Sequence, residues 1–190
     1  GQGYIQSTPL QLCMMTAQIA NGGYAIKPKI IVDNNPISYE DAKQSMESGL
    51  LFDTNSESLL DKKLFKDKRN IKIVQEAMFS STNERFGTSY KSRIDDPKYQ
   101  FAGKTGTAQV KRISKREREL DLELEQIPYK DRDHALYVAY GPYINPRYAL
   151  SIIIEHGGSG SKAAAPIAKK LFKLIIDRHE LRNKQSNFER

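Results

Sequence analysis

The sequence predicts an α+β fold in which an antiparallel sheet is flanked by helices. Two apolar segments, 134–140 and 148–155, are separated only by the turn residues of 141–146. Strands joined by so short a connection pair in antiparallel orientation. The segment 99–110 also has the pattern of a strand, with small residues in its middle. We therefore expect three strands in one sheet.

Three segments have the periodicity of helices that bury one face. Residues 8–20 begin with threonine followed by proline at the first helical position, and the Asn-Gly-Gly of 21–23 suits a helix C-terminus. Residues 71–79 and 163–179 also repeat apolar side chains at helical spacing. Pro166 is tolerated only in a first turn, so the last helix should begin just before it.

Length and charge limit the classes of function. A chain of 190 residues with 38% hydrophobic residues suits one folded domain, and its net charge is +7. Acidic and basic residues balance within 111–133, so binding of nucleic acid is not expected there. The basic surplus is C-terminal, where we expect a solvated helix face with at most a weak attraction to an anionic polymer. It comprises Lys169, Lys170, Lys173, Arg178, Arg182, Lys184 and Arg190.

Neither the cysteine nor the histidines predict a metal site, and no pattern predicts a cofactor. Cys13 lies in an apolar segment and is interpreted as a small core residue with an inert thiol. His134, His156 and His179 lack the spacing of metal ligands. We interpret His134 as structural and expect a local hydrogen bond for His156. The chain contains no apolar run of 18 residues.

The tetrapeptide Lys104-Thr105-Gly106-Thr107 places a cation, two hydroxyls and a glycine on an expected strand. Alternation sends Lys104 and Gly106 to one face and Thr105 and Thr107 to the other. On an edge strand beside a cleft, the lysine would raise the local potential and the hydroxyls would bind a carboxylate. The glycine would let another chain approach closely. From this tetrapeptide alone, an ordinary strand with a solvent-facing lysine remains an alternative.

Further motifs follow one another along the chain in a fixed order. They are Gly1-Gln2-Gly3-Tyr4, Thr8-Pro9-Leu10-Gln11, Ala20-Asn21-Gly22-Gly23, Gly87-Thr88, Ala102-Gly103-Lys104-Thr105-Gly106-Thr107-Ala108-Gln109, Arg132-Asp133-His134-Ala135, Glu155-His156-Gly157-Gly158 and Ala164-Ala165-Pro166. Together they resemble class B penicillin-binding proteins, most closely the elongation-type penicillin-binding protein 2, and Lys-Thr-Gly is similar to the third motif of that serine enzyme superfamily.

The resemblance implies a domain assignment. It makes residues 1–180 the C-terminal part of a transpeptidase domain, with a partial penicillin-binding, β-lactamase-like fold. Within it, 33–70 would be loop-rich and 111–132 a charged insertion, and 181–190 would be a frayed tail.

The resemblance also implies an activity for the parent protein, a peptidoglycan D,D-transpeptidase. A serine attacks the D-Ala-D-Ala bond of a stem peptide, and the acyl-enzyme is transferred to an amine of a neighbouring stem peptide. β-Lactam antibiotics acylate the same serine. Lys104 would support the proton network, Thr105, Gly106 and Thr107 would hold the substrate, and the Thr107 backbone N–H would donate to the oxyanion hole. Gln109 would touch the bound peptide.

No nucleophile is expected in this chain, because the family's Ser-x-x-Lys and Ser-x-Asn motifs precede Lys-Thr-Gly. Two segments match those motifs in letters only. Ser159-Gly160-Ser161-Lys162 follows the lysine motif and occupies a glycine-rich turn, and Ser81-Thr82-Asn83 is interpreted as a helix-ending turn. We therefore expect a fragment that is inactive alone.

Two other functions remain open, a serine β-lactamase-like protein and a non-catalytic cell-wall or partner-binding module. By the resemblance, the parent lies at the periplasmic face of the bacterial inner membrane, anchored by an N-terminal helix absent from this chain. It would pair with a membrane glycosyltransferase of the shape, elongation, division and sporulation family. An incomplete sheet would leave apolar surface exposed, so a dimer of the chain is also expected.

Overall fold

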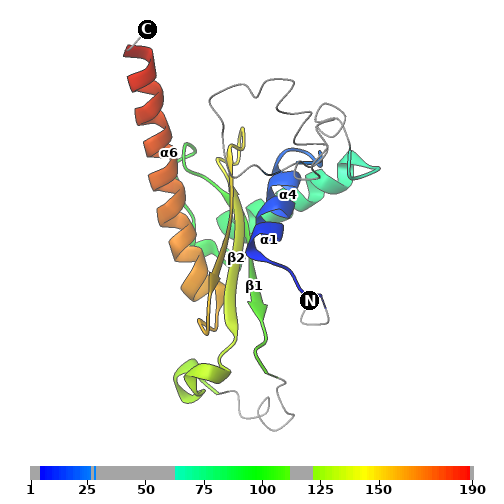
Figure 1. The fold of residues 1–190 in the computed structure, drawn as a ribbon, viewed down its shortest axis with the longest axis vertical. Helices are drawn as coiled ribbons and strands as arrows, with labels where there is room; N and C mark the ends of the chain where they lie inside the picture. Colours follow the sequence, from blue (N-terminus) through cyan, green and yellow to red (C-terminus); the bar gives the residue numbers. More distant parts are fainter. Residues whose placement is uncertain (1–4, 27, 29–62, 112–121, 189–190) are drawn as a thin grey trace, which may run out of the picture.

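The fold is a three-layer arrangement in which a sheet lies between helices (Figure 1). The computed structural model describes residues 5–26, 28, 63–111 and 122–188. Within these ranges, one antiparallel sheet has the strand order β1-β2-β3. Helix α6 covers one face and helices α1 and α4 lie on the other (Figure 1). The strands are β1 (Ala102–Ala108), β2 (His134–Gly141) and β3 (Tyr148–Ile154).

The sheet confirms the predicted α+β class and the antiparallel hairpin. Strand β1 pairs with β2 through Thr105 and Tyr137, and β2 pairs with β3 through Tyr137 and Ile152. Strand β1 is shorter than the predicted 99–110, since it begins at Ala102 and ends at Ala108.

Helix α1 (Pro9–Ala20) has the predicted start, while helix α4 (Lys68–Asn83) exceeds its prediction at both ends. In α1 the Thr8 side chain accepts a hydrogen bond from the Gln11 backbone N–H, and the Gln11 side chain accepts one from Thr8. In α4 the Asp67 carboxylate accepts the backbone N–H of Arg69, so an acidic cap starts the helix inside the segment expected to be a loop.

The last helix is also longer than predicted. A π-helical turn, η4 (Gly160–Ala164), precedes α6 (Ala165–Phe188), and the helix continues into the segment 181–190 for which we predicted a frayed tail. Most of the predicted extended segment 25–32 and most of 33–70 lie outside the described residues. The charged insertion is described from residue 122, where it forms the 3-10 turns η2 (Leu124–Gln126) and η3 (Tyr129–Asp131).

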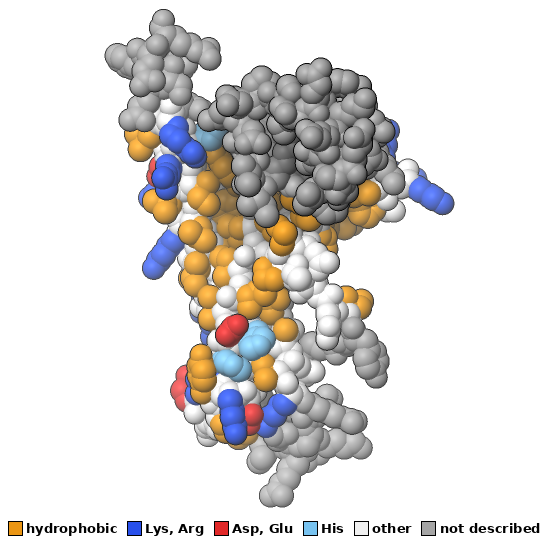
Figure 2. Space-filling view, viewed as in Figure 1, with side chains coloured by type: hydrophobic (Ala, Val, Ile, Leu, Met, Phe, Trp, Pro, Cys, Tyr) orange, Lys and Arg blue, Asp and Glu red, His pale blue; other side chains and the backbone are white. Residues whose placement is uncertain are grey.

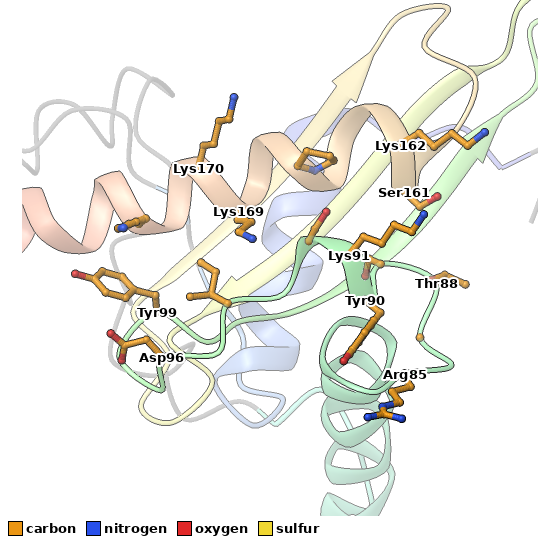
Figure 3. A pocket seen from close by; sticks show the side chains of 16 residues that line it. Arg85, Thr88, Tyr90, Lys91, Asp96, Tyr99, Ser161, Lys162, Lys169 and Lys170 are labelled. Atoms are coloured by element: carbon orange, nitrogen blue, oxygen red, sulfur yellow. The ribbon is translucent and has the colours of Figure 1, made fainter.

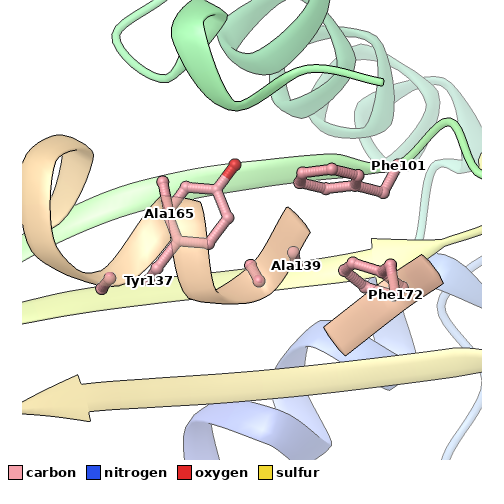
Figure 4. Packing of buried hydrophobic residues seen from close by; sticks show 7 residues of the cluster. Phe101, Tyr137, Ala139, Ala165 and Phe172 are labelled. Atoms are coloured by element: carbon pink, nitrogen blue, oxygen red, sulfur yellow. The ribbon is translucent and has the colours of Figure 1, made fainter. Parts of the chain in front are cut away.

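Two apolar clusters hold the layers together. Between the sheet and α6, the ring of Phe101 stacks on Phe172 at 4.8 Å between centroids and meets Tyr137 edge-on (Figure 4). On the opposite face, Met78 of α4 packs with Ala102 and Tyr140 of the sheet. Figure 2 shows hydrophobic side chains along α6 and beside it. No helix in the described ranges is long and apolar enough to cross a bilayer.

Candidate functional site

The predicted tetrapeptide lies in β1, which forms an edge of the described sheet. Lys104 stands opposite Val138, and Thr105 stands opposite Tyr137. Directly opposed side chains share a face, so Thr105 faces the α6 layer with Tyr137, whereas Lys104 faces the layer of α1 and α4. This is the alternation that the sequence predicted.

All four residues of the tetrapeptide are accessible. Lys104 and Thr107 are exposed, and Thr105 and Gly106 are half-buried. The Lys104 ammonium donates to the Thr105 carbonyl at 2.9 Å and lies 3.4 Å from the Thr105 hydroxyl oxygen. A positive charge therefore sits beside a hydroxyl on an accessible sheet edge, which is an arrangement suited to binding a carboxylate. Gln109 is exposed one residue beyond the end of β1.

A chain of hydroxyls joins Thr105 to the end of α4. The Thr105 Oγ1 lies 3.3 Å from the Thr88 Oγ1, which in turn lies 3.2 Å from the Ser81 Oγ. Gly87 makes this placement possible, because a Cβ there would lie 2.4 Å from the Ser81 carbonyl oxygen. Only a glycine lets the chain return so closely to the helix end and present Thr88 to the strand.

A second set of hydroxyls is buried and joins β2, the strand paired with β1, to the end of α4 and to Ser89. The Tyr137 hydroxyl lies 2.9 Å from the Thr82 Oγ1 and 3.0 Å from the Ser89 Oγ, and all three side chains are buried. Burial is the main cause that raises the pKa of Tyr137, so the phenol stays protonated and donates within this set. Sequence reasoning missed these partners; only the Gly87-Thr88 motif pointed to this part of the chain.

The two segments that match the nucleophile motifs have other roles. Ser81, Thr82 and Asn83 form the last turn of α4, which agrees with the helix-ending turn that the sequence predicted. At the end of the helix, the Asn83 side-chain amide donates to the carbonyls of Phe79 and Phe101. Through Thr82 and Asn83, the end of α4 is joined to Tyr137 of β2 and to Phe101, the residue before β1.

Ser159-Gly160-Ser161-Lys162 packs directly behind the tetrapeptide. A Cβ on Gly160 would lie 2.4 Å from the Leu136 carbonyl oxygen and 2.8 Å from that of Gly106. The sequence predicted that Gly106 would let another chain approach closely. In the structure, the segment that approaches Gly106 is Gly160 of the same chain. The Ser159 hydroxyl bonds to the Ser161 hydroxyl at 3.0 Å, and Lys162 is exposed.

The histidines and the cysteine have structural contacts. The His156 backbone N–H donates to His134 Nδ1 at 2.9 Å, and His156 Nδ1 lies 3.0 Å from the Arg132 carbonyl. The Cys13 thiol donates to the Ala149 carbonyl at 3.4 Å, and burial raises its pKa. Within the described residues, no group of three or more His, Cys, Asp or Glu side chains is arranged to hold a metal ion.

The sheet edge carries Lys-Thr-Gly-Thr, the glycine-containing turn η4 packs behind it, and helix α6 covers the sheet. Together these features define a class of domain. The chain belongs to the penicillin binding protein transpeptidase domain family, whose model matches residues 1–173.

Individual relatives narrow the likeness to penicillin-binding protein 2. The chain is 30% identical over 181 residues to the peptidoglycan D,D-transpeptidase MrdA of Salmonella typhimurium strain LT2, covering 93% of this chain and 26% of that protein. MrdA of Haemophilus influenzae is 30% identical over 182 residues, with 93% and 25% coverage. The chain therefore spans about a quarter of the length of the curated relatives it matches.

Solved structures give the same result. Penicillin-binding protein 2 of Pseudomonas aeruginosa, in complex with WCK 5153, aligns with a TM-score of 0.64 at 31% identity over 92% of this chain and 31% of that one. The Helicobacter pylori protein, in complex with MreC, aligns with a TM-score of 0.62 at 27% identity over 93% and 26%. The predicted resemblance to penicillin-binding protein 2 is confirmed.

Proposed function

We propose that this chain is the C-terminal part of the transpeptidase domain, residues 1–180, of a peptidoglycan D,D-transpeptidase. The observation that carries the proposal is the accessible Lys104-Thr105-Gly106-Thr107 edge strand in a chain that the transpeptidase family model matches from residue 1 to 173. The parent protein cross-links stem peptides through a serine acyl-enzyme and is acylated by β-lactams. The chain alone, without that serine, is inactive.

Each residue of the strand has a distinct role in this proposal. The Lys104 ammonium stabilises negative charge and supports proton transfer beside the serine. The hydroxyls of Thr105 and Thr107 hold the terminal carboxylate of the acyl donor, and the Thr107 backbone N–H donates to the oxyanion. Gly106 has no side chain, so the substrate can approach the strand closely. Gln109 contacts the bound peptide just past the end of β1.

Thr88 joins this set in our proposal as a positioning residue. Its hydroxyl can donate to or accept from Thr105 at 3.3 Å. If the Thr105 hydroxyl donates its hydrogen bond to the substrate carboxylate, the Thr88 hydroxyl can donate a hydrogen bond to the Thr105 oxygen. The Thr105 rotamer is thereby held ready for the carboxylate.

The proposal extends to place and partners. The parent protein acts at the periplasmic face of the inner membrane, anchored by an N-terminal helix, and pairs with a membrane glycosyltransferase of the shape, elongation, division and sporulation family. Its ligands are peptidoglycan stem peptides and β-lactams. The similar Helicobacter pylori protein forms a complex with MreC, which supports membership of an assembly.

Labelling of the full-length parent protein with a fluorescent penicillin tests the proposed function. Lys104→Ala should slow acylation by about 100-fold, because it removes the cation beside the reacting serine. Lys130→Ala, an exposed lysine on η3, is the matched control and should be labelled at the normal rate.

Three outcomes separate the candidates. Labelling that is equally fast in the Lys104→Ala variant would contradict the assigned role of the strand. Rapid turnover of a chromogenic cephalosporin would favour a β-lactamase over a transpeptidase. Absence of labelling in the full-length protein would favour a non-catalytic cell-wall module.

A further inference from the structure

A groove of about 940 Å³ runs between α6 and the segment 85–99. Figure 3 shows the side chains of both walls, with Lys91 and Lys169 extending into the space between them. Its lining includes rings and apolar side chains from Tyr90, Ile94, Tyr99 and Pro166. The volume lies at the upper end of the range for small-molecule sites, so it has room for several residues of a chain.

The walls of this groove are strongly basic. Six cationic side chains line it against a single carboxylate, that of Asp96; the cations are Arg85, Lys91, Lys162, Lys169, Lys170 and Lys173. None of the six forms an ion pair with a residue that the structure describes. Like charges gathered without counter-charges repel one another, and an anionic ligand would relieve that repulsion.

The nearby acidic groups do not neutralise the groove. Asp177 of α6 accepts the hydroxyl hydrogen of Tyr99, and Lys98 lies between Asp177 and Glu180, 2.8 Å from the latter. Asp95 pairs with Arg93 at 2.9 Å. These carboxylates are already paired. Asp177 also interacts electrostatically with Lys173, whose ammonium lies 5.9 Å from the centre of the Tyr99 ring, whereas the other five groove cations form no ion pair with a described residue.

The spacing of the cations points to a chain rather than to a single ion. Lys162 and Lys173 are separated by eleven positions along η4 and α6, which corresponds to about 16 Å at the helical rise of 1.5 Å per residue. An extended peptide covers that distance in about five residues. A single phosphate or carboxylate could reach only part of this row.

The groove leads to the candidate substrate strand. Thr88 lines the groove and its hydroxyl lies 3.3 Å from the hydroxyl of Thr105. A chain lying in the groove would therefore pass close to the face of β1 on which Thr105 is placed. The apolar lining residues would pack against aliphatic side chains while the lysines meet carboxylates.

We propose that this groove binds a carboxylate-bearing peptide chain, namely stem peptides of uncross-linked peptidoglycan that extend beyond the reacting D-Ala-D-Ala end. This inference rests on the proposed function and adds a second substrate-binding surface to it. The groove increases the local concentration of the polymer beside β1 without taking part in bond making or breaking.

Fluorescence anisotropy on the full-length parent protein tests the inference after penicillin has blocked the reactive serine. The probe is a fluorescein-labelled, uncross-linked glycan chain that carries stem peptides, compared with the same chain after amidation of its carboxylates. Lys169→Gln combined with Lys173→Gln should weaken binding roughly fivefold, as expected for two solvent-exposed charge pairs. Amidation of the probe should have at least the same effect, and added salt should weaken binding further.

The matched control is Lys66→Gln combined with Lys68→Gln, which removes the same charge from exposed positions outside the groove. Thermal unfolding first shows that both variants are folded. If the Lys169/Lys173 variant then binds the probe as tightly as the control variant does, the inference is overturned. Competition by polyphosphate but not by hexaglutamate would also overturn it in favour of a phosphate polymer. If penicillin fails to label the protein, the proposed function is contradicted but the groove inference is not, because binding to the groove is measured separately by anisotropy.

Discussion

Tyr137 links the sheet to the segment that carries Thr88. Its hydroxyl is the meeting point of the Thr82 and Ser89 side chains in a region without solvent contact. Both partners keep one further acceptor, the carbonyl of Met78 for Thr82 and that of Ser81 for Ser89. The phenol therefore contributes to stability without being the sole partner of either group.

Tyr137→Phe should lower the free energy of unfolding by about 1 kcal/mol, the usual net value of a lost buried hydrogen bond whose partners are still satisfied. Urea unfolding measures this change. Tyr129→Phe is the control, because Tyr129 is 64% exposed. An effect no larger than in that control would show that the buried hydroxyls do not hold β2 and α4 together.

Gly160 is one of the residues whose small size the candidate site requires. Its backbone lies so close to Gly106 and Leu136 that a methyl group would have to displace strand backbone rather than a flexible side chain. Gly160→Ala should therefore destabilise the protein by about 1–3 kcal/mol and slow penicillin acylation, because η4 would push on the strand that binds substrate. Lys162→Ala in the same turn controls for stability. Unchanged unfolding in Gly160→Ala would contradict this packing.

Among the elements, the sequence predicts existence and type better than ends. Strand alternation and the hairpin follow from local patterns, so the sheet and the two faces of the tetrapeptide could be predicted. The ends of α4 depend on Asp67 and Asn83, whose side chains bond to neighbouring backbone and to Phe101. Such partners are fixed by tertiary packing, which the periodicity of one segment does not contain.

The same limit applies to the candidate site. Lys104 to Thr107 could be found because they form one continuous motif. Thr88 and Ser81 act only through their hydrogen bonds across the fold to Thr105, and Gly160 acts through a contact with a strand more than fifty residues earlier. The basic groove likewise needs two distant segments, so the C-terminal lysines alone predicted only a weak attraction to anions.

The contact between α6 and the segment 95–99 depends on pH, because it contains a hydrogen bond between two titratable groups, Tyr99 and Asp177. The hydrogen bond from Tyr99 is the main cause that lowers the pKa of Asp177, and that same bond is the main cause that raises the pKa of Tyr99. A lowered carboxyl pKa stabilises the fold above its ordinary value of 3.8 and loses this effect as the pH falls through the lower folded value. A raised phenol pKa stabilises below 10.0 and loses its effect as the pH rises through the higher folded value.

Asp177→Asn should therefore lower the Tm between about pH 4 and pH 10, and the difference from wild type should shrink on either side of that window. Thermal unfolding across the pH range measures it. Asp95→Asn, at an 82% exposed side chain, is the control and should show a smaller difference. A difference that persists unchanged in acid would contradict the role of the Tyr99 bond.

At the scale of the whole molecule, the described residues leave two apolar surfaces near each other. No described strand pairs with the outer edge of β3, whose residues are all half-buried. On α6, Ile167, Leu174 and Leu181 recur every seven positions and are 38%, 62% and 62% exposed. Seven residues make almost two full helical turns, so these side chains form one stripe (Figure 2 shows hydrophobic side chains along this helix).

The isolated 190-residue chain should therefore self-associate, since an open sheet edge and an exposed apolar stripe both favour pairing between copies. Leu174→Glu combined with Leu181→Glu should shift the chain towards monomer, because two charges would then lie within the interface. Ile73→Glu on α4 is the control, as Ile73 is 61% exposed on the other side of the sheet. Size-exclusion chromatography with light scattering measures the mass. A wild-type chain that stays monomeric at high concentration would show that this surface does not drive association.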